Sequence, residues 1–161
     1  MADVRDRDRT AGPSQPARSS ARPVVLATLS APVDRAAEEM AIASALEAGV
    51  PLIVANMLEL PPYPATMMLF GPGGATLPHE EALEEVRGTA ARAAALGIRT
   101  ELLRVSTLHP VRALLEILAE RDAGLLVFGP DAARIRGRRF RSAARQVRRR
   151  APCLVWIAPD G

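Results

Sequence analysis

The stretch GLLVFG, residues 124–129, places four large apolar residues between two glycines. A short, continuous apolar run bounded by turn residues is typical of a strand buried on both faces. The segment before it, 110–123, has leucines at helical spacing and begins with proline, which favours the first turn of a helix. After it come a polar, arginine-rich loop at 130–141, a helical segment at 142–150 and an apolar run at 154–158. The C-terminal third therefore predicts helix, strand, helix and strand.

The same alternation extends toward the N-terminus. Apolar runs at 24–29 and 52–57 predict two more strands, residues 100–105 are interpreted as another, and the segments 33–48 and 79–96 have helical spacing. Continuous apolar strands that alternate with helices predict a parallel sheet covered on both faces. Right-handed crossovers make such a sheet doubly wound, so the predicted fold class is α/β with five strands.

Composition and length limit the class of protein. The 161 residues correspond to about one domain. Residues 1–22 contain almost no large apolar residue and predict a disordered tail, which leaves residues 23–159 as the folded domain. No segment reaches the ~18 apolar residues of a membrane span, and no secretory signal is present, so we expect a cytoplasmic protein without a membrane partner. Cys153 is the single cysteine and predicts a buried, inert thiol.

Charge is distributed unevenly along the chain. The net charge is +3, but residues 23–131 carry −7 and residues 132–161 carry +8. Nine arginines lie within residues 134–150, with no acidic residue among them. One interpretation is a solvated basic face that complements the acidic body, and another is an anion site for a nucleotide, polyphosphate or nucleic acid. Nucleic acid is the weaker candidate, because Phe140 is the one aromatic residue of this segment.

No catalytic constellation is evident in the sequence. His79 and His109 are interpreted as helix-start or surface residues. The acidic run within residues 80–85 suits the first turn and solvated face of a helix rather than a metal site. The absence of lysine excludes a P-loop. The apolar patch Met67–Phe70, in a Pro/Gly-rich connection, is interpreted as a lid or an interface contact.

Several features together resemble the universal stress protein family. They are a first strand ending near Ala27, a long connection after the second strand, His109-Pro110, residues 125–129 and Ala151-Pro152-Cys153. The resemblance covers residues 23–159 and implies the adenine nucleotide alpha hydrolase-like fold, with strands in the order 3-2-1-4-5. It also implies a ligand crevice where the strand order reverses. It further implies a homodimer paired through the last strand, with Trp156 in the core or the interface.

ATP-binding members of that family have an Asp after the first strand. After the fourth strand they carry a pattern of Gly, two residues, Gly, nine residues, Gly, and Ser or Thr. Here Leu29 occupies the Asp position, and Ala132 and Arg141 replace the second and last glycines. The resemblance gives this candidate nucleotide or anion site: Thr28, Met57 (at the adenine pocket), Gly129, Arg141, Ser142 and Ala143.

These departures argue against ATP bound in the family's usual manner. An arginine, Arg141 or the nearby Arg138 or Arg139, could hold a phosphate by its side chain instead. We therefore expect a binding or regulatory module with a degenerate nucleotide site, no enzymatic activity and no required cofactor, with ATP or another adenine nucleotide as the alternative ligand. Polyanion or nucleic-acid binding through residues 134–150 and weak nucleotide hydrolysis are the alternative functions.

Overall fold

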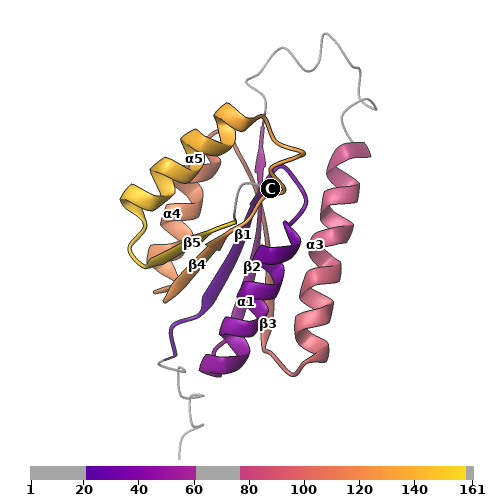
Figure 1. The fold of residues 1–161 in the computed structure, drawn as a ribbon, viewed down its shortest axis with the longest axis vertical. Helices are drawn as coiled ribbons and strands as arrows, with labels where there is room; N and C mark the ends of the chain where they lie inside the picture. The colour runs from indigo at the N-terminus through magenta and orange to yellow at the C-terminus, as the bar shows by residue number, and fades with distance from the viewer. Residues whose placement is uncertain (1–20, 61–76, 159–161) are drawn as a thin grey trace, which may run out of the picture.

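The computed structural model of this chain describes residues 21–60 and 77–158, and only the backbone of residues 77–81 (Figure 1). The predicted tail falls almost wholly outside these residues, and the patch Met67–Phe70 falls entirely outside them.

The described residues form one sheet and four helices. The strands are β1 (Val24–Leu29), β2 (Leu52–Glu59), β3 (Thr100–Thr107), β4 (Leu125–Phe128) and β5 (Leu154–Ile157). The helices are α1 (Arg35–Ala48), α3 (Leu77–Ala95), α4 (Pro110–Glu120) and α5 (Gly137–Arg150). Every strand pair is parallel, and the order is β3-β2-β1-β4-β5. The predicted α/β class and the strand order implied by the resemblance are therefore confirmed.

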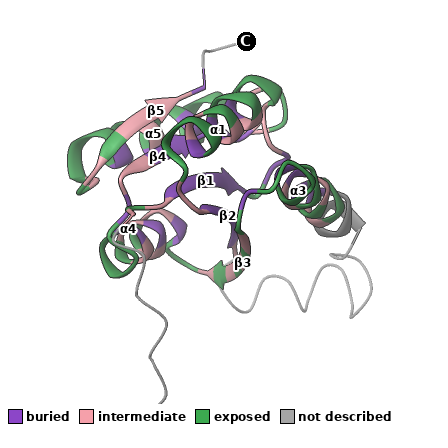
Figure 2. Cartoon of the chain, turned by 90° about the horizontal axis from the view of Figure 1, so that it is seen from below, coloured by how far each residue is buried: buried purple, intermediate pink, exposed green. Residues whose placement is uncertain are grey.

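Two hydrophobic cores lie on the two faces of the sheet. Because side chains alternate along a strand, Val25 and Ala27 of β1 pack with α4 and α5, whereas Val24 and Leu26 pack with α1. Figure 2 shows β1 and β2 buried at the centre, between helices on either side. This central burial explains why both strands are uniformly apolar over most of their length.

The prediction for α5 was wrong at its start. The helix begins at Gly137, five residues before the predicted Ser142. Arginine is a good helix former, and Phe140, Ala143 and Val147 form one buried stripe that includes the earlier turn. The preceding loop is correspondingly shorter. Arg141, Ser142 and Ala143 therefore lie in the second turn of a helix rather than at its N-terminus.

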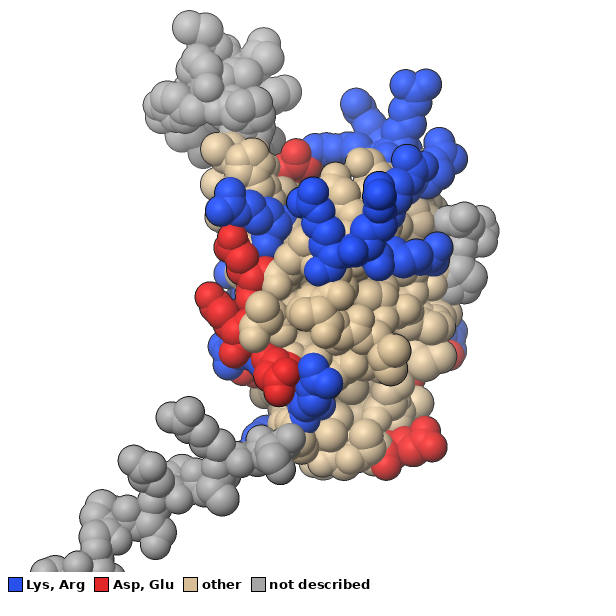
Figure 3. Space-filling view, turned by 90° about the vertical axis from the view of Figure 1, so that its left-hand side faces the viewer, with Lys and Arg blue, Asp and Glu red and all other residues tan. Residues whose placement is uncertain are grey.

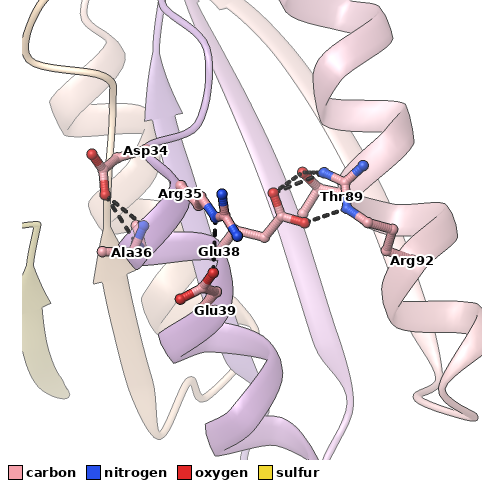
Figure 4. Close-up of polar contacts among 8 residues, drawn as sticks. Asp34, Arg35, Ala36, Glu38, Glu39, Thr89 and Arg92 are labelled. Atoms are coloured by element: carbon pink, nitrogen blue, oxygen red, sulfur yellow. Dashed lines mark hydrogen bonds and ion pairs between the residues drawn. The ribbon is translucent and has the colours of Figure 1, made fainter.

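Helix α1 is fixed at its start and against α3. The Asp34 carboxylate caps α1 by accepting hydrogen bonds from the backbone N–H groups of Ala36 (2.9 Å) and Ala37 (3.1 Å). One turn later, Glu38 accepts from Arg92 of α3 in a bidentate pair, with Nη2 at 2.8 Å from Oε2 (Figure 4). The hydrogen bond to Glu38 raises the pKa of Arg92. This pair ties together the two helices that cover one face of the sheet.

Candidate ligand cavity

A cavity of about 440 Å³ lies between α4 and α5, at the carboxyl ends of the central strands. Its apolar lining is Leu29, Leu108, Pro110, Val111 and Ala143. Its polar lining is Glu59, His109, Arg112, Arg139, Ser142 and Gln146. The sheet order reverses beside β1, and the carboxyl edge at such a reversal is where open α/β sheets bind ligands. The position and the mixed lining therefore mark this cavity as the candidate site.

The floor of the cavity follows from strand alternation. Leu29 is the last residue of β1 and lies on the same face as Val25 and Ala27, under α4 and α5. The sheet therefore presents an apolar side chain at this point. An apolar floor favours a flat, weakly polar ligand group over a charged one.

An ion pair connects the two sides of the cavity. Arg139, in the first turn of α5, donates a hydrogen bond to the carboxylate of Glu59 at the end of β2. Arg112 of α4 pairs with Glu116 one turn later, at 3.0 Å between Nε and Oε1. Both arginines that line the cavity are thus matched by carboxylates of the protein. Less positive charge is left for a phosphate than the sequence suggests.

Three further polar groups line the cavity. His109 is the N-cap residue of α4 and is exposed, as predicted, and its backbone N–H donates to the Thr107 hydroxyl at 3.1 Å. Ser142 and Gln146 lie one turn apart on α5, with Gln146 Nε2 at 3.5 Å from Ser142 Oγ. A hydroxyl, an amide and an imidazole can each donate and accept hydrogen bonds. They suit the polar edge of a heterocycle or a sugar.

Gly129 packs against α1 and does not line the cavity. A Cβ added at Gly129 would lie 2.0 Å from the Cβ of Ala37. The Gly129 carbonyl also accepts a hydrogen bond from the Asp34 backbone N–H at 2.9 Å. This glycine is therefore required by the close approach of α1 to the end of β4.

Comparison with known proteins shows which family this chain belongs to. The sequence model of the universal stress protein family matches residues 21–159. This chain belongs to the universal stress protein family. No curated protein matches the chain at a significant level of sequence similarity.

Solved structures of other universal stress proteins share the fold. One from Archaeoglobus fulgidus is 23% identical, with a TM-score of 0.59 over 84% of this chain and 97% of that one. A universal stress protein solved in complex with cAMP is 25% identical, with a TM-score of 0.58 over 87% of this chain and 98% of that one. UspA from Lactobacillus plantarum is 14% identical, with a TM-score of 0.64 over 86% of this chain and 98% of that one.

The structure brings together only part of the predicted nucleotide site of this universal stress protein. Ser142 and Ala143 line the cavity. Met57 is 1% exposed and packs in the core of the same face, so it is not part of the lining. Arg141 lies on the opposite flank of α5, where it lines a different groove. The grouping inferred from the family pattern is therefore only partly reproduced.

Thr28 belongs to the other face of the sheet. It alternates with Leu29 along β1 and is fully buried, with its hydroxyl donating to Asn56 Oδ1 at 3.3 Å. Within the described residues, the Asn56 side-chain N–H₂ has no hydrogen-bond partner. Thr28 and Asn56 thus form a buried polar pair beneath α1 and α3, separated from the cavity by the sheet.

Sequence reasoning missed several lining residues of this universal stress protein. Glu59 and His109 follow apolar runs of neighbouring strands, and the carboxyl ends of parallel strands meet at one edge, so this signal could have found them. Arg139, named from the sequence as a possible phosphate ligand, does line the cavity. Gln146 gave no signal in the sequence, because the direction of its side chain depends on where α5 begins. The described part of the chain contains no cluster of three metal-ligating side chains and no helix long and apolar enough to cross a membrane.

Cys153 lies near the start of β5 and is half-buried rather than fully buried. Burial raises the pKa of its thiol. The thiol is therefore protonated near neutral pH, and a protonated thiol is a poor nucleophile. The structure gives this cysteine no place in the candidate site.

Proposed function

We propose that this universal stress protein binds an adenine nucleoside or nucleoside monophosphate in the cavity between α4 and α5. The observation that carries the proposal is the cavity itself, which has an apolar floor at Leu29 and hydrogen-bonding groups on Ser142, Gln146 and His109. Its volume of about 440 Å³ is in the range of small-molecule sites. Related universal stress proteins have been solved in complexes with cAMP and with dAMP, which supports a ligand of this size.

A triphosphate is a poorer fit to this site. Leu29 stands where ATP-binding members carry a carboxylate, and Gly129 is covered by Ala37 of α1. Arg139 is held by Glu59, so a phosphate would have to break that ion pair to use the guanidinium. These features support a degenerate site that no longer holds a long phosphate chain.

The same contacts support binding without catalysis. A hydrolase needs a general base within reach of the attacking water. Glu59 is the carboxylate that lines the cavity, and Arg139 occupies one of its oxygens, which leaves that oxygen unavailable to an attacking water. We therefore propose that the protein is a binding or regulatory module. Weak nucleotide hydrolysis is the less favoured of the two functions.

Titration calorimetry with AMP and ATP tests the proposal. We expect AMP to bind at least as tightly as ATP, because the added phosphates gain no partners. Ser142→Trp places a large ring in the cavity and should weaken AMP binding by at least about tenfold, equivalent to about 1.4 kcal/mol. Ala36→Trp, at an exposed position of α1, is the matched control and should leave the affinity unchanged. Much tighter binding of ATP than AMP, or an unaffected Ser142→Trp variant, would contradict the proposal.

We also propose that two copies pair through β5. This strand is at the edge of the sheet, and Leu154 at its start is 75% exposed. An open edge with an exposed apolar residue is a template for pairing with another strand. Antiparallel pairing about a twofold axis would place both α5 helices on one face of a continuous sheet, with their arginines opposite each other.

Salt should strengthen this dimer. The facing arginines repel at low ionic strength and are screened at high ionic strength, so we expect association to be several-fold tighter at about 300 mM salt than at about 20 mM. Sedimentation equilibrium measures the difference. Leu154→Lys should weaken the dimer at both salt concentrations, whereas Leu96→Lys, at another exposed leucine, should not. A monomer at all protein concentrations and both salts would refute the pairing.

A further inference from the structure

A second groove lies on the other flank of α5, between this helix and the end of β5. Its volume is about 430 Å³. Phe140, Ala144, Ile157 and Ala158 form its apolar part. Arg141, Arg145, Arg148 and Arg149 form its basic part, which we call the arginine row. Helix α5 thus separates two cavities with different chemistry.

Within the described residues, no carboxylate lies within ion-pair distance of the arginine row. Among the side chains that the structure describes, Arg134 and Arg139 are the members of segment 134–150 with a carboxylate within ion-pair distance. Figure 3 shows basic side chains massed over the upper part of this face, with a largely uncharged surface below them and most of the visible acidic groups along the left edge. By contrast, Arg35, Arg87 and Arg112 on the other helices each pair with a nearby glutamate. No carboxylate of the described residues therefore competes with a ligand for the arginine row.

Helix stability accounts for only part of the arginine row. Arg148, Arg149 and Arg150 lie in the last turn, where positive charge favours the helix dipole. Arg141 and Arg145 lie in the middle of α5, where the dipole offers no such gain. Like charges four residues apart, as in Arg141 and Arg145, destabilise a helix by a few tenths of a kcal/mol. An anion in the groove would turn this cost into a favourable interaction.

The spacing and the lining suggest what kind of anion fits. Arg141, Arg145 and Arg148 lie on successive turns, about 5–6 Å apart along the helix. Each guanidinium can hold phosphate oxygens in a bidentate manner, which lysine cannot do. The aromatic ring in the groove belongs to Phe140, which is 5% exposed and packed against Phe128, so it offers no surface for stacking a base. A linear phosphate chain without bases therefore suits the groove better than nucleic acid.

We propose that the groove between α5 and β5 is a binding site for inorganic polyphosphate, held by the arginine row. This site is separate from the cavity between α4 and α5 and does not depend on the function proposed for that cavity.

Fluorescence titration with short-chain inorganic polyphosphate, over a range of salt concentrations, tests the inference. If three or four arginines each contact the chain, the logarithm of the binding constant should fall with the logarithm of salt concentration with a slope of about −2 to −3. The triple variant Arg141→Gln, Arg145→Gln and Arg148→Gln should bind at least about thirtyfold more weakly and show a flatter slope. The corresponding Arg→Lys variant keeps the charge and should recover only part of the affinity.

The matched control is Arg35→Gln, Arg99→Gln and Arg104→Gln, which removes the same charge from exposed positions outside α5. It should bind polyphosphate nearly as well as the unmodified protein, as should Ser142→Trp. Equal losses in the two triple variants would show a general charge effect and overturn the proposal. Single-stranded DNA of matched charge that bound as tightly, with the same dependence on the arginine row, would also overturn it in favour of nucleic acid. Thermal unfolding of each variant verifies that it is folded.

Discussion

Gly129→Ala is expected to lower the free energy of unfolding by about 1–3 kcal/mol, because overpacking of a tight contact typically costs this much. The new Cβ would meet the Cβ of Ala37 at 2.0 Å, which forces α1 and the end of β4 apart. For a chain of this length the melting temperature should fall by roughly 2–12 °C. Thermal and denaturant unfolding measure both quantities.

The second variant of this test is Ala37→Gly. Alone it removes the opposing methyl and should cost about 1 kcal/mol, the penalty for glycine in a helix. Combined with Gly129→Ala it should restore most of the lost stability, because the two methyl groups no longer collide. If the two effects simply added, the contact with α1 would not be the reason for this glycine. A Gly129→Ala protein of normal stability that had lost ligand binding would instead place Gly129 in the ligand site.

Phe128→Ala should lower the free energy of unfolding by about 3–5 kcal/mol, as is usual for truncation of a buried phenylalanine. Phe128 is 1% exposed at the end of β4, and its ring stacks on that of Phe140 in the first turn of α5, with centroids 6.1 Å apart and planes 16° apart. We expect the melting temperature to fall by roughly 6–20 °C. Loss of the ring removes both buried area and the support beneath α5.

A double-mutant cycle isolates the ring contact. Phe128→Ala and Phe140→Ala should together cost less than the sum of their single effects, with a coupling of about 0.5–1.5 kcal/mol. Leu96→Ala, at an exposed position just after α3 and outside the proposed dimer edge, is the control and should change stability by less than about 0.5 kcal/mol. Independent effects of the two phenylalanines would show that the stacked pair does not hold α5 in place.

The central strands could be predicted because they are buried on both faces. Val24–Leu29 is apolar at almost every position, and the predicted limits match those of β1. The predicted ends of β2 and β3 were too early, since Glu59 and Thr107 are polar yet still pair at the carboxyl edge. Hydrophobic periodicity fails at this edge, because the sheet opens to solvent where the ligand cavity lies.

The start of α5 could not be predicted from local polarity. Residues 130–141 contain many arginines, and their polarity concealed the buried position of Phe140. Contact with Phe128 across the core extends the helix back to Gly137. That extension turns Ser142 toward one cavity and Arg141 toward the other groove. Sequence spacing alone could not separate these two neighbours.

The amino-acid sequence by itself determined the alternation of strands and helices and the family. It also showed that Leu29 stands in place of the aspartate, and Arg141 in place of the last glycine, of the family's nucleotide-binding pattern. Those properties depend on residue type and on spacing along the chain. Only the tertiary structure decided that Gly129 packs on Ala37, that Glu59 neutralises Arg139, and that α5 divides the basic segment between two sites. Each of these depends on contacts between residues far apart in sequence or on the direction in which a helix presents its side chains, and neither is encoded in local pattern.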